Sequence, residues 1–234
     1  MSTLLAIKHP NLLQYIGHAL TKERGEWNLL VLLEYIDGNN LGQILYDQNL
    51  KQKLNVTQSA KTRILMRLAL ALAHLHDSQR QIVHGDVKPT NVMISRFKKV
   101  KLCDMGMTKI KHYSMLFFQR SLIAHGSPAY MAPEQLMEGK EPSTHTDVYA
   151  FGLTMYEVLY EDPICEEENL EDLMKRLRSE DIPAKLKKKQ DDLHYSLMQQ
   201  CLQREPSSRP DAQQIVSRIT AISLHMNIKP IMLP

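Results

Sequence analysis

The hydrophobic pattern is clearest in residues 57–77, where apolar side chains recur at the spacing of an α-helix. Alanine and leucine surround this stretch on nearly every face, which indicates a helix buried at the centre of a domain. Its apolar positions at helical spacing are Ile64, Leu65, Leu68, Leu72 and Leu75.

Two apolar runs nearer the N-terminus predict a β-hairpin. Residues 12–19 and 29–35 are rich in Leu, Ile, Val and Tyr, and the polar residues 21–26 between them are typical of a turn. A two-stranded sheet is marginal in water, so we expect the hairpin to pack on another element or to join a larger sheet. Before it, residues 4–8 are typical of the end of a helix, which Pro10 terminates.

The segment after this hairpin contains a break and a short helix. Residues 37–40 are predicted to be the break, and Asn39 or Asn40 is placed to cap a helix at 41–47. A second, short hairpin is predicted from two apolar runs, at 92–94 and 100–103.

The C-terminal half is predicted to be a long loop followed by helices. Residues 107–130 are irregular and rich in Ser, His and Lys, and a loop of that length in a compact domain usually has a function. Pro210 stands at a favoured helix start. The predicted helices are 146–160, 170–179, 191–202 and 211–224.

Composition and charge are those of an ordinary globular protein. Of the 234 residues, 43% are hydrophobic and 24% are charged, and the formal net charge is +3. This length allows one large domain or two small lobes with a sizeable core. Basic runs at 96–101 and 185–189 are offset by acidic ones at 166–168 and 171–172, so no single-sign field indicates a nucleic-acid partner.

Cysteine usage and hydropathy indicate a soluble cytoplasmic protein. Cys103, Cys165 and Cys201 are far apart and form no Cys-x-x-Cys pair, so neither a zinc site nor a disulfide framework is expected. The longest apolar stretch, 68–75, is too short to span a bilayer. Residues 1–4 lack the basic segment of a signal peptide.

Residues 84–91, with the sequence His-Gly-Asp-Val-Lys-Pro-Thr-Asn, concentrate the chemistry of the chain. Asp86, Lys88 and Asn91 have no packing reason to share one loop. They suit phosphoryl transfer, which needs a carboxylate to hold the incoming hydroxyl, a cation near the transferred phosphoryl group and an oxygen donor for Mg²⁺. Asp104, thirteen residues after Asn91, is a second candidate metal carboxylate.

Four segments and a closing pair stand in a fixed order along the chain. They are 84–91, Asp104-Met105-Gly106, Gly-Ser-Pro-Ala-Tyr-Met-Ala-Pro-Glu at 126–134, Asp-Val-Tyr-Ala-Phe-Gly at 147–152, and Arg209-Pro210. From about His9 onward the chain resembles the eukaryotic protein kinase family, whose motifs are H-R-D-L-x-x-x-N, D-F-G and A-P-E. The similarity is to the serine/threonine type and its tyrosine-kinase-like group. The implied fold is α+β, with a mostly helical C-lobe and an incomplete β-rich N-lobe.

The resemblance implies a role for each polar residue of the loop. Asp86 would orient the substrate hydroxyl and accept its proton, and Lys88 would neutralise the transferred phosphoryl group. Asn91 and Asp104 would hold Mg²⁺ on the phosphates of ATP. Ser127 stands where such kinases place a hydroxyl that hydrogen-bonds around the catalytic aspartate. The expected cofactors are ATP and Mg²⁺, and the expected partner is a protein with a Ser or Thr hydroxyl.

The resemblance also implies an adenine site in the segment that joins the lobes. Backbone groups of Glu34 and Ile36 would face the adenine, and Leu33 would be the gatekeeper. Met93 would lie beneath the ring.

Other residues are expected to be structural. Glu134 and Arg209 resemble a buried ion pair, and Asp147 resembles the residue that anchors the catalytic-loop backbone. His84 is expected to be a packed imidazole rather than a base. Taken alone, Asp104 could be an acid in a turn before Gly106.

Three departures from the family pattern matter. No G-x-G-x-x-G or V-A-I-K precedes His9, so we expect the sequence to begin inside the regulatory helix of a truncated N-lobe. Gly85 replaces the arginine that receives the activation-loop phosphate, which disfavours switching by that route. Met105 replaces a phenylalanine, a mild apolar change. The expected division is an N-lobe remnant at 1–36, a C-lobe at 37–225 and a tail at 226–234.

Three functions are compatible with these features. The first is a serine/threonine protein kinase, impaired because the phosphate cover and its lysine are missing. The second is a non-catalytic, pseudokinase-like interaction module. The third is a small-molecule phosphotransferase similar to aminoglycoside and choline kinases, which carry a His-Gly-Asp-x-x-x-x-Asn loop. Those enzymes lack the Lys-Pro pair and the 126–134 stretch that are present here.

Overall fold

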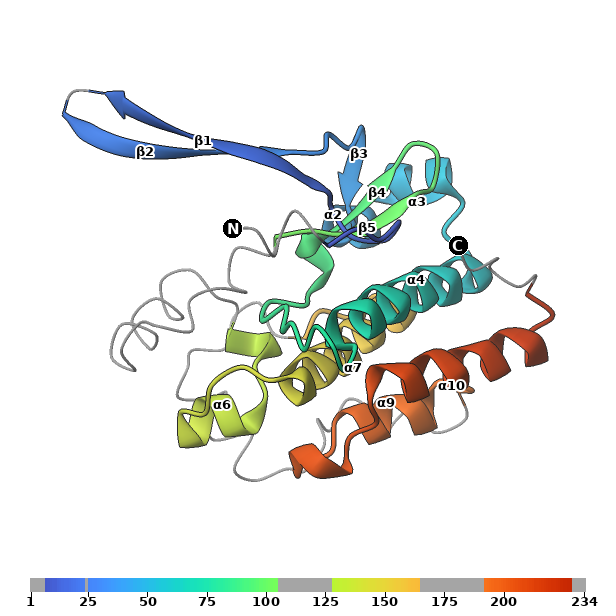
Figure 1. The fold of residues 1–234 in the computed structure, drawn as a ribbon. Helices are drawn as coiled ribbons and strands as arrows, with labels where there is room; N and C mark the ends of the chain where they lie inside the picture. Colours follow the sequence, from blue (N-terminus) through green and yellow to red (C-terminus); the bar gives the residue numbers. More distant parts are fainter. Residues whose placement is uncertain (1–6, 24, 105–127, 165–191, 229–234) are drawn as a thin grey trace.

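The computed structural model describes residues 7–23, 25–104, 128–164 and 192–228. Helices make up about half of this part of the chain, and two small antiparallel sheets lie on one side of them (Figure 1). None of the helices in these ranges is long and apolar enough to cross a membrane.

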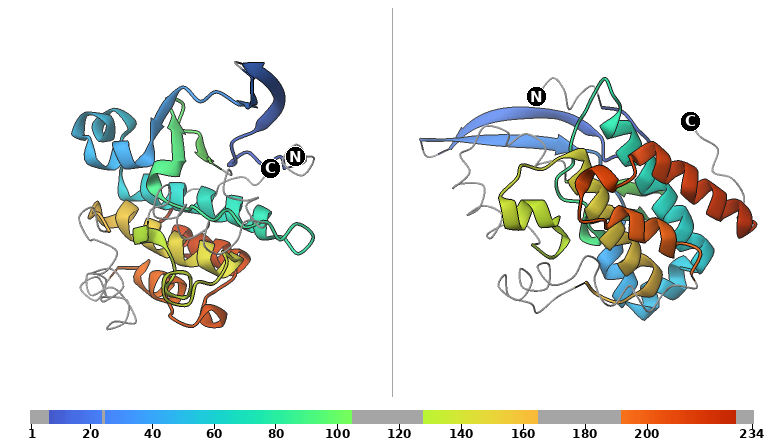
Figure 2. Two further views of the ribbon diagram at one scale, coloured as in Figure 1. Left: turned by 90° about the vertical axis from the view of Figure 1, so that its left-hand side faces the viewer. Right: turned by 90° about the horizontal axis from the view of Figure 1, so that it is seen from below.

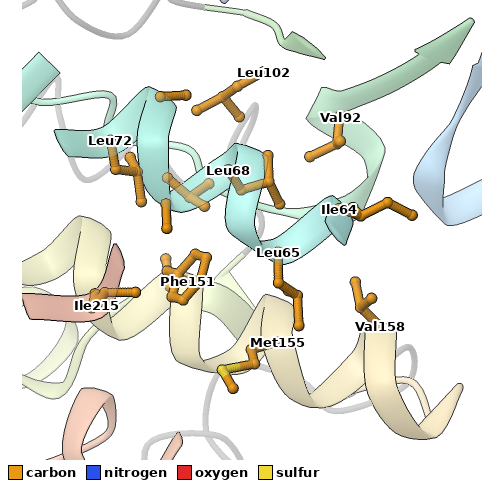
Figure 3. Close-up of a cluster of buried hydrophobic side chains, with 14 of the residues drawn as sticks. Ile64, Leu65, Leu68, Leu72, Val92, Leu102, Phe151, Met155, Val158 and Ile215 are labelled. Carbon is orange, nitrogen blue, oxygen red and sulfur yellow. The ribbon is translucent and has the colours of Figure 1, made fainter. Parts of the chain in front are cut away.

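The core forms around helix α4 (Gln58–His76), as the apolar pattern at 57–77 predicts. The Thr57 side chain accepts a hydrogen bond from the N–H of Ala60 at the first turn, which explains why the helix begins there. In Figure 3, Leu65, Leu68 and Leu72 face the side chains of helix α7 (Thr144–Tyr160). Val92 and Leu102 cover the opposite side of α4.

Two further helices complete the helical layer. Helix α10 (Ala212–His225) begins at an Asp211 capping box and packs along α4. Helix α9 (Tyr195–Cys201) packs on α7 and is shorter than the predicted 191–202. A Cβ on Gly152 would lie 2.9 Å from the Cβ of Cys201, so this glycine permits the close approach of α7 and α9. The predicted helix at 170–179 lies outside the described residues.

The first sheet corrects the expected break at 37–40. Residues Gly38–Asn40 form strand β3, which pairs with β4 (Val92–Ser95), and β4 pairs with β5 (Val100–Leu102). Glycine and asparagine are typical of turns, but the distant partner strand decides the conformation here. A Cβ on Gly38 would lie 2.1 Å from the carbonyl oxygen of Ile94, so only glycine fits.

The short elements differ from prediction in several places. Asn40 caps helix α2 (Leu41–Tyr46) with a full capping box, as expected for one of the two asparagines. Helices α3 (Gln48–Leu54) and α6 (Pro133–Glu138) were not predicted. Residues 7 and 8 are not helical, and the rest of the helix end expected at 4–8 lies outside the described residues. So does most of the predicted loop at 107–130.

The second sheet is the predicted hairpin, but its strands are longer and its turn is shorter. Strand β1 (Tyr15–Glu23) pairs with β2 (Glu26–Leu33), and the pairing continues to Glu23 and Glu26. The expected polar turn at 21–26 is therefore mostly strand, and Lys22 lies over the Trp27 ring at 5.6 Å across the ladder. Among the described residues the hairpin forms a sheet of its own, which projects from the helices (Figure 2). Every residue of β2 is exposed, so the expected packing against another element is not seen there.

Candidate active site

One buried carboxylate fixes the backbone of the loop at 84–91. Asp147, in the first turn of α7, is 1% exposed. It accepts hydrogen bonds from the backbone N–H of His84 at 2.7 Å and of Gly85 at 2.8 Å, and from His76 Nε2 at 2.8 Å. Gly85 has a φ of +81°, a conformation that favours glycine. The structure therefore shows the anchoring contact that the sequence predicts for Asp147.

The His84 imidazole is a structural group. It is fully buried, and its Nε2 donates to the carbonyl oxygen of Cys103 at 2.9 Å. Its Nδ1 accepts the backbone N–H of Asp86 at 3.3 Å. Because both ring nitrogens have backbone partners, His84 holds the loop against the segment before Asp104 and is not placed to act as a base.

Asp86, Lys88 and Asn91 form one polar cluster. Lys88 Nζ lies 2.8 Å from Asp86 Oδ2. Asn91 Nδ2 donates to the same oxygen at 2.7 Å and to the Asp86 carbonyl at 2.8 Å. Asn91 closes a 3₁₀ turn (Pro89–Asn91) in which its N–H bonds to the Lys88 carbonyl at 3.0 Å. The cluster presents an oriented carboxylate beside a cation, which is what transfer to a hydroxyl requires.

Strand pairing brings Asp104 next to this cluster. Val92 pairs with Leu102, and the Cys103 N–H donates to the Asn91 carbonyl at 2.8 Å. Cys103 therefore lies opposite Asn91, and Asp104 is the next residue in the chain. Asp104 is exposed and has a φ of +60°. Burial raises the pKa of the neighbouring Cys103 thiol to about 11, which keeps it protonated and unsuited to nucleophilic chemistry.

The donor set of Asn91 and Asp104 suits Mg²⁺. Both Asn91 amide hydrogens are used on Asp86, and within the described ranges no donor bonds to its Oδ1, so that oxygen is available to a ligand. A carboxylate and an amide oxygen are ligands that Mg²⁺ prefers, and it usually takes only one or two from the protein. No group of three His, Cys, Asp or Glu side chains in the described part of the chain could hold a metal.

Of the residues expected at the adenine site, Glu34 and Ile36 lie on the segment after β2. The N–H of Glu34 donates to the Gln14 carbonyl at 2.8 Å, so the carbonyl of Glu34 is the backbone group left for a ligand. Ile36 is half-buried, and Met93 lies in β4, two residues beyond Asn91. Leu33, the expected gatekeeper, ends β2 and is 45% exposed.

A lysine that sequence reasoning missed ties this segment to the site. Lys101 Nζ lies 2.7 Å from the Glu34 carboxylate and donates to the Leu12 carbonyl at 3.1 Å. Burial alone would raise the pKa of Glu34, but the hydrogen bonds from Lys101 and the Gln14 N–H hold it below its usual value. The sequence near Lys101 does not indicate this pair, because Lys101 belongs to a run of cations of the kind usually found on a surface.

Helix α6 and the segment before it are held in place by two carboxylates. Glu134 forms a two-pronged ion pair with Arg209, at 2.6 and 2.8 Å, as the sequence predicts. Glu157 accepts from the Tyr46 hydroxyl at 2.8 Å and from the Tyr130 hydroxyl. Sequence reasoning missed Glu157, although an acid in an otherwise apolar helix is a signal for a buried partner. Ser127, expected beside Asp86, lies outside the described residues.

Comparison with known proteins agrees with this geometry. Residues 1–219 match the family model described as protein tyrosine and serine/threonine kinase. The chain is 30% identical to a dual specificity protein kinase, shkC, of Dictyostelium discoideum, over 91% of this chain and 40% of that protein. It is 36% identical to the L-type lectin-domain containing receptor kinase V.5 of Arabidopsis thaliana, over 68% of this chain and 23% of that protein.

A third relative matches a larger share of this chain than the first two. The mitogen-activated protein kinase kinase kinase 3 of Arabidopsis thaliana is 29% identical over 95% of this chain and 35% of that protein. The chain thus spans less than half the length of these three relatives. On the family model and the arrangement around Asp86, the chain belongs to the protein tyrosine and serine/threonine kinase family.

Proposed function

We propose that this chain is a protein serine/threonine kinase domain that transfers the γ-phosphate of ATP to a protein hydroxyl. The observation that carries the proposal is the Asp86 carboxylate, held by Asn91 beside the Lys88 ammonium on a loop that Asp147 fixes. The Lys-Pro-x-Asn form of this loop supports Ser or Thr as the acceptor. A dual specificity protein kinase among the relatives makes Tyr the alternative to test.

Within this proposal each polar side chain has one task. Asp86 orients the incoming hydroxyl and accepts its proton, and Lys88 stabilises the negative charge that develops on the transferred phosphoryl group. Asn91 and Asp104 hold Mg²⁺, which neutralises phosphate charge when it is bound. Ser127 supports Asp86 through its hydroxyl.

The adenine site completes the proposed nucleotide position. The Glu34 carbonyl and the Ile36 backbone face the adenine, Leu33 limits the depth of the site, and Met93 lies beneath the ring. The proposed division places this segment at the end of an N-lobe part, 1–36, with the C-lobe at 37–225 and a tail at 226–234. The Lys101–Glu34 ion pair supports a fixed position for the segment.

We further infer that these 234 residues transfer phosphate slowly. Their sequence contains no G-x-G-x-x-G loop and no V-A-I-K lysine before His9. Positioning and charge stabilisation are nearly all that kinases contribute to the reaction, so the rate should be orders of magnitude below that of a complete site. The second function to test is a non-catalytic, pseudokinase-like interaction module.

A transfer assay separates the two functions. The chain is incubated with Mg²⁺, γ-labelled ATP and casein, alone and as a fusion in which a relative's glycine-rich loop and lysine-bearing strands precede it. We expect weak labelling by the chain, strong labelling by the fusion, and label on Ser and Thr. If neither protein labels casein although circular dichroism shows that both are folded, the kinase proposal is refuted and the interaction module remains.

Replacing Asp104 with asparagine should weaken Mg²⁺-dependent nucleotide binding and leave folding nearly unchanged. The exposed side chain contributes little packing, whereas loss of the carboxylate charge weakens the attraction of the side chain for Mg²⁺. We expect at least a tenfold rise in the Mg·ATP Kd, measured by thermal shift and titration, an effect of about 1.4 kcal/mol.

Asp37→Asn is the matched control for this change. Asp37 is also exposed, and its partner is Arg96 on a different loop, so its replacement should leave nucleotide binding unchanged. If Asp104→Asn instead unfolds the protein, Asp104 is a structural turn residue and its assignment to the metal is wrong.

A further inference from the structure

The turn between β4 and β5 is rigid. The Ser95 N–H donates to the Lys99 carbonyl at 2.9 Å, and the Lys98 N–H donates back to the Ser95 carbonyl at 2.8 Å. The buried Ser95 hydroxyl oxygen accepts from the N–H groups of Phe97 and Lys99, at 3.2 and 3.1 Å. Four residues are thereby held in one shape, so a contact through them would lose little conformational entropy.

This turn displays an aromatic ring surrounded by cations. Phe97 is 71% exposed, and the Arg96 guanidinium lies over its ring, 4.8 Å from the centroid. Lys98 and Lys99 are exposed, and neither has a salt bridge within the described ranges. Asp37 forms an ion pair with Arg96 at 3.1 Å. From residue 87 to residue 103 the sequence has no Asp or Glu.

We propose that this basic turn, residues 95–99, binds the surface of an anionic membrane. Cations attract the headgroups of acidic lipids, and an aromatic ring is favoured at the interface between headgroups and acyl chains. The turn lies at the end of the small sheet, at the upper right of Figure 1. A protein partner would need about 800 Å² on each side, which a turn of this size does not offer by itself.

The position of the turn keeps the active site clear of such a surface. Strand β4 runs from Asn91 to the turn, and its four residues span about 13 Å. The cluster around Asp86 lies at one end of this strand and Phe97 lies beyond the other. Binding through the turn would therefore hold the kinase domain at a membrane without covering Asp86.

The test is co-sedimentation of the whole chain with vesicles. Phosphatidylcholine vesicles with about a third phosphatidylserine are compared with pure phosphatidylcholine vesicles at low and high salt. We expect binding to the anionic vesicles alone, reduced in high salt because the charges are screened. Phe97→Ala should lower the bound fraction several-fold. Lys98→Glu with Lys99→Glu should lower it to background, because each lysine near the surface contributes about fivefold.

The control variant makes the same charge change elsewhere. Lys140→Glu with Arg218→Glu alters two exposed cations, one just after α6 and one on α10, and these helices lie away from the turn (Figure 1). This variant should bind nearly as well as the original chain. The proposal would be overturned if the control variant lost as much vesicle binding as the lysine variant. It would also be overturned if the original chain bound neutral vesicles as well as anionic ones, or bound neither. In the last case an acidic protein surface is the partner to test next.

Discussion

Replacing Asp86 with asparagine is expected to reduce phosphate transfer by a factor of about 10²–10⁴. Asparagine has the same shape as aspartate, and its amide oxygen can still accept the hydrogen bonds that Asn91 and Lys88 donate to Asp86. It cannot accept the proton of an incoming hydroxyl. The rate should therefore fall while the position of the loop is kept.

Labelling of a protein substrate by the fusion described above checks this prediction. The fusion is used because its expected higher rate makes a large decrease measurable. Thermal unfolding of the same variant should agree with that of the parent within about 1 kcal/mol, since the loop remains anchored by Asp147. A variant that transfers phosphate at the parent rate would show that Asp86 is not the base. Asp37→Asn is again the matched control, as an exposed acid outside the cluster.

Replacing Glu134 with alanine is expected to lower the free energy of unfolding by about 3–5 kcal/mol. The Arg209 side chain is 0% exposed, and Glu134 is the acid that neutralises it through two hydrogen bonds. Arg209 would keep its hydrogen bonds to the carbonyls of Gln203, Arg204 and His145, but carbonyl groups leave the buried charge uncompensated.

Urea denaturation of two companion variants makes this prediction specific. Glu138→Ala, on the same helix, removes an exposed acid that pairs with Lys140 and should leave the denaturation midpoint unchanged. Glu134→Ala combined with Arg209→Met removes the buried charge and should recover part of the lost stability. If Glu134→Ala alone unfolds at the parent midpoint, the pair makes no net contribution to stability.

The elements that could be predicted from sequence are those whose signals are local. The long helix shows its apolar spacing and its cap residue Thr57 within a single stretch, and α10 shows Asp211 in the same way. Strand β3 could not be predicted, because its three residues become a strand only by pairing with residues 93–95, more than 50 positions away. The extension of the hairpin to Glu23 and Glu26 likewise depends on its cross-strand partner.

The candidate site likewise contains some contacts that could be predicted from the sequence and others that could not. The spacing of Asp86, Lys88 and Asn91 within one loop was enough to predict that these polar side chains cluster, and the buried partners Glu134 and Arg209 followed from the family motifs. The Lys101–Glu34 pair and the two tyrosine bonds to Glu157 could not be predicted, because each joins residues that only the folded chain brings together. The polar character of these residues was visible, but the identity of their partners was not.

The Asp147 carboxylate has a consequence for the motions available to the site. It bonds to two consecutive peptide N–H groups of the loop from within the buried first turn of α7. Those two amides can exchange their hydrogens with water only when the bonds break, and breaking them leaves the buried carboxylate with His76 alone of its three partners. The slowest-exchanging amides of an enzyme are usually those of its core helices and strands. We therefore expect the N–H groups of His84 and Gly85 to exchange as slowly as those of the core helices, because Asp147 couples opening of this loop to α7.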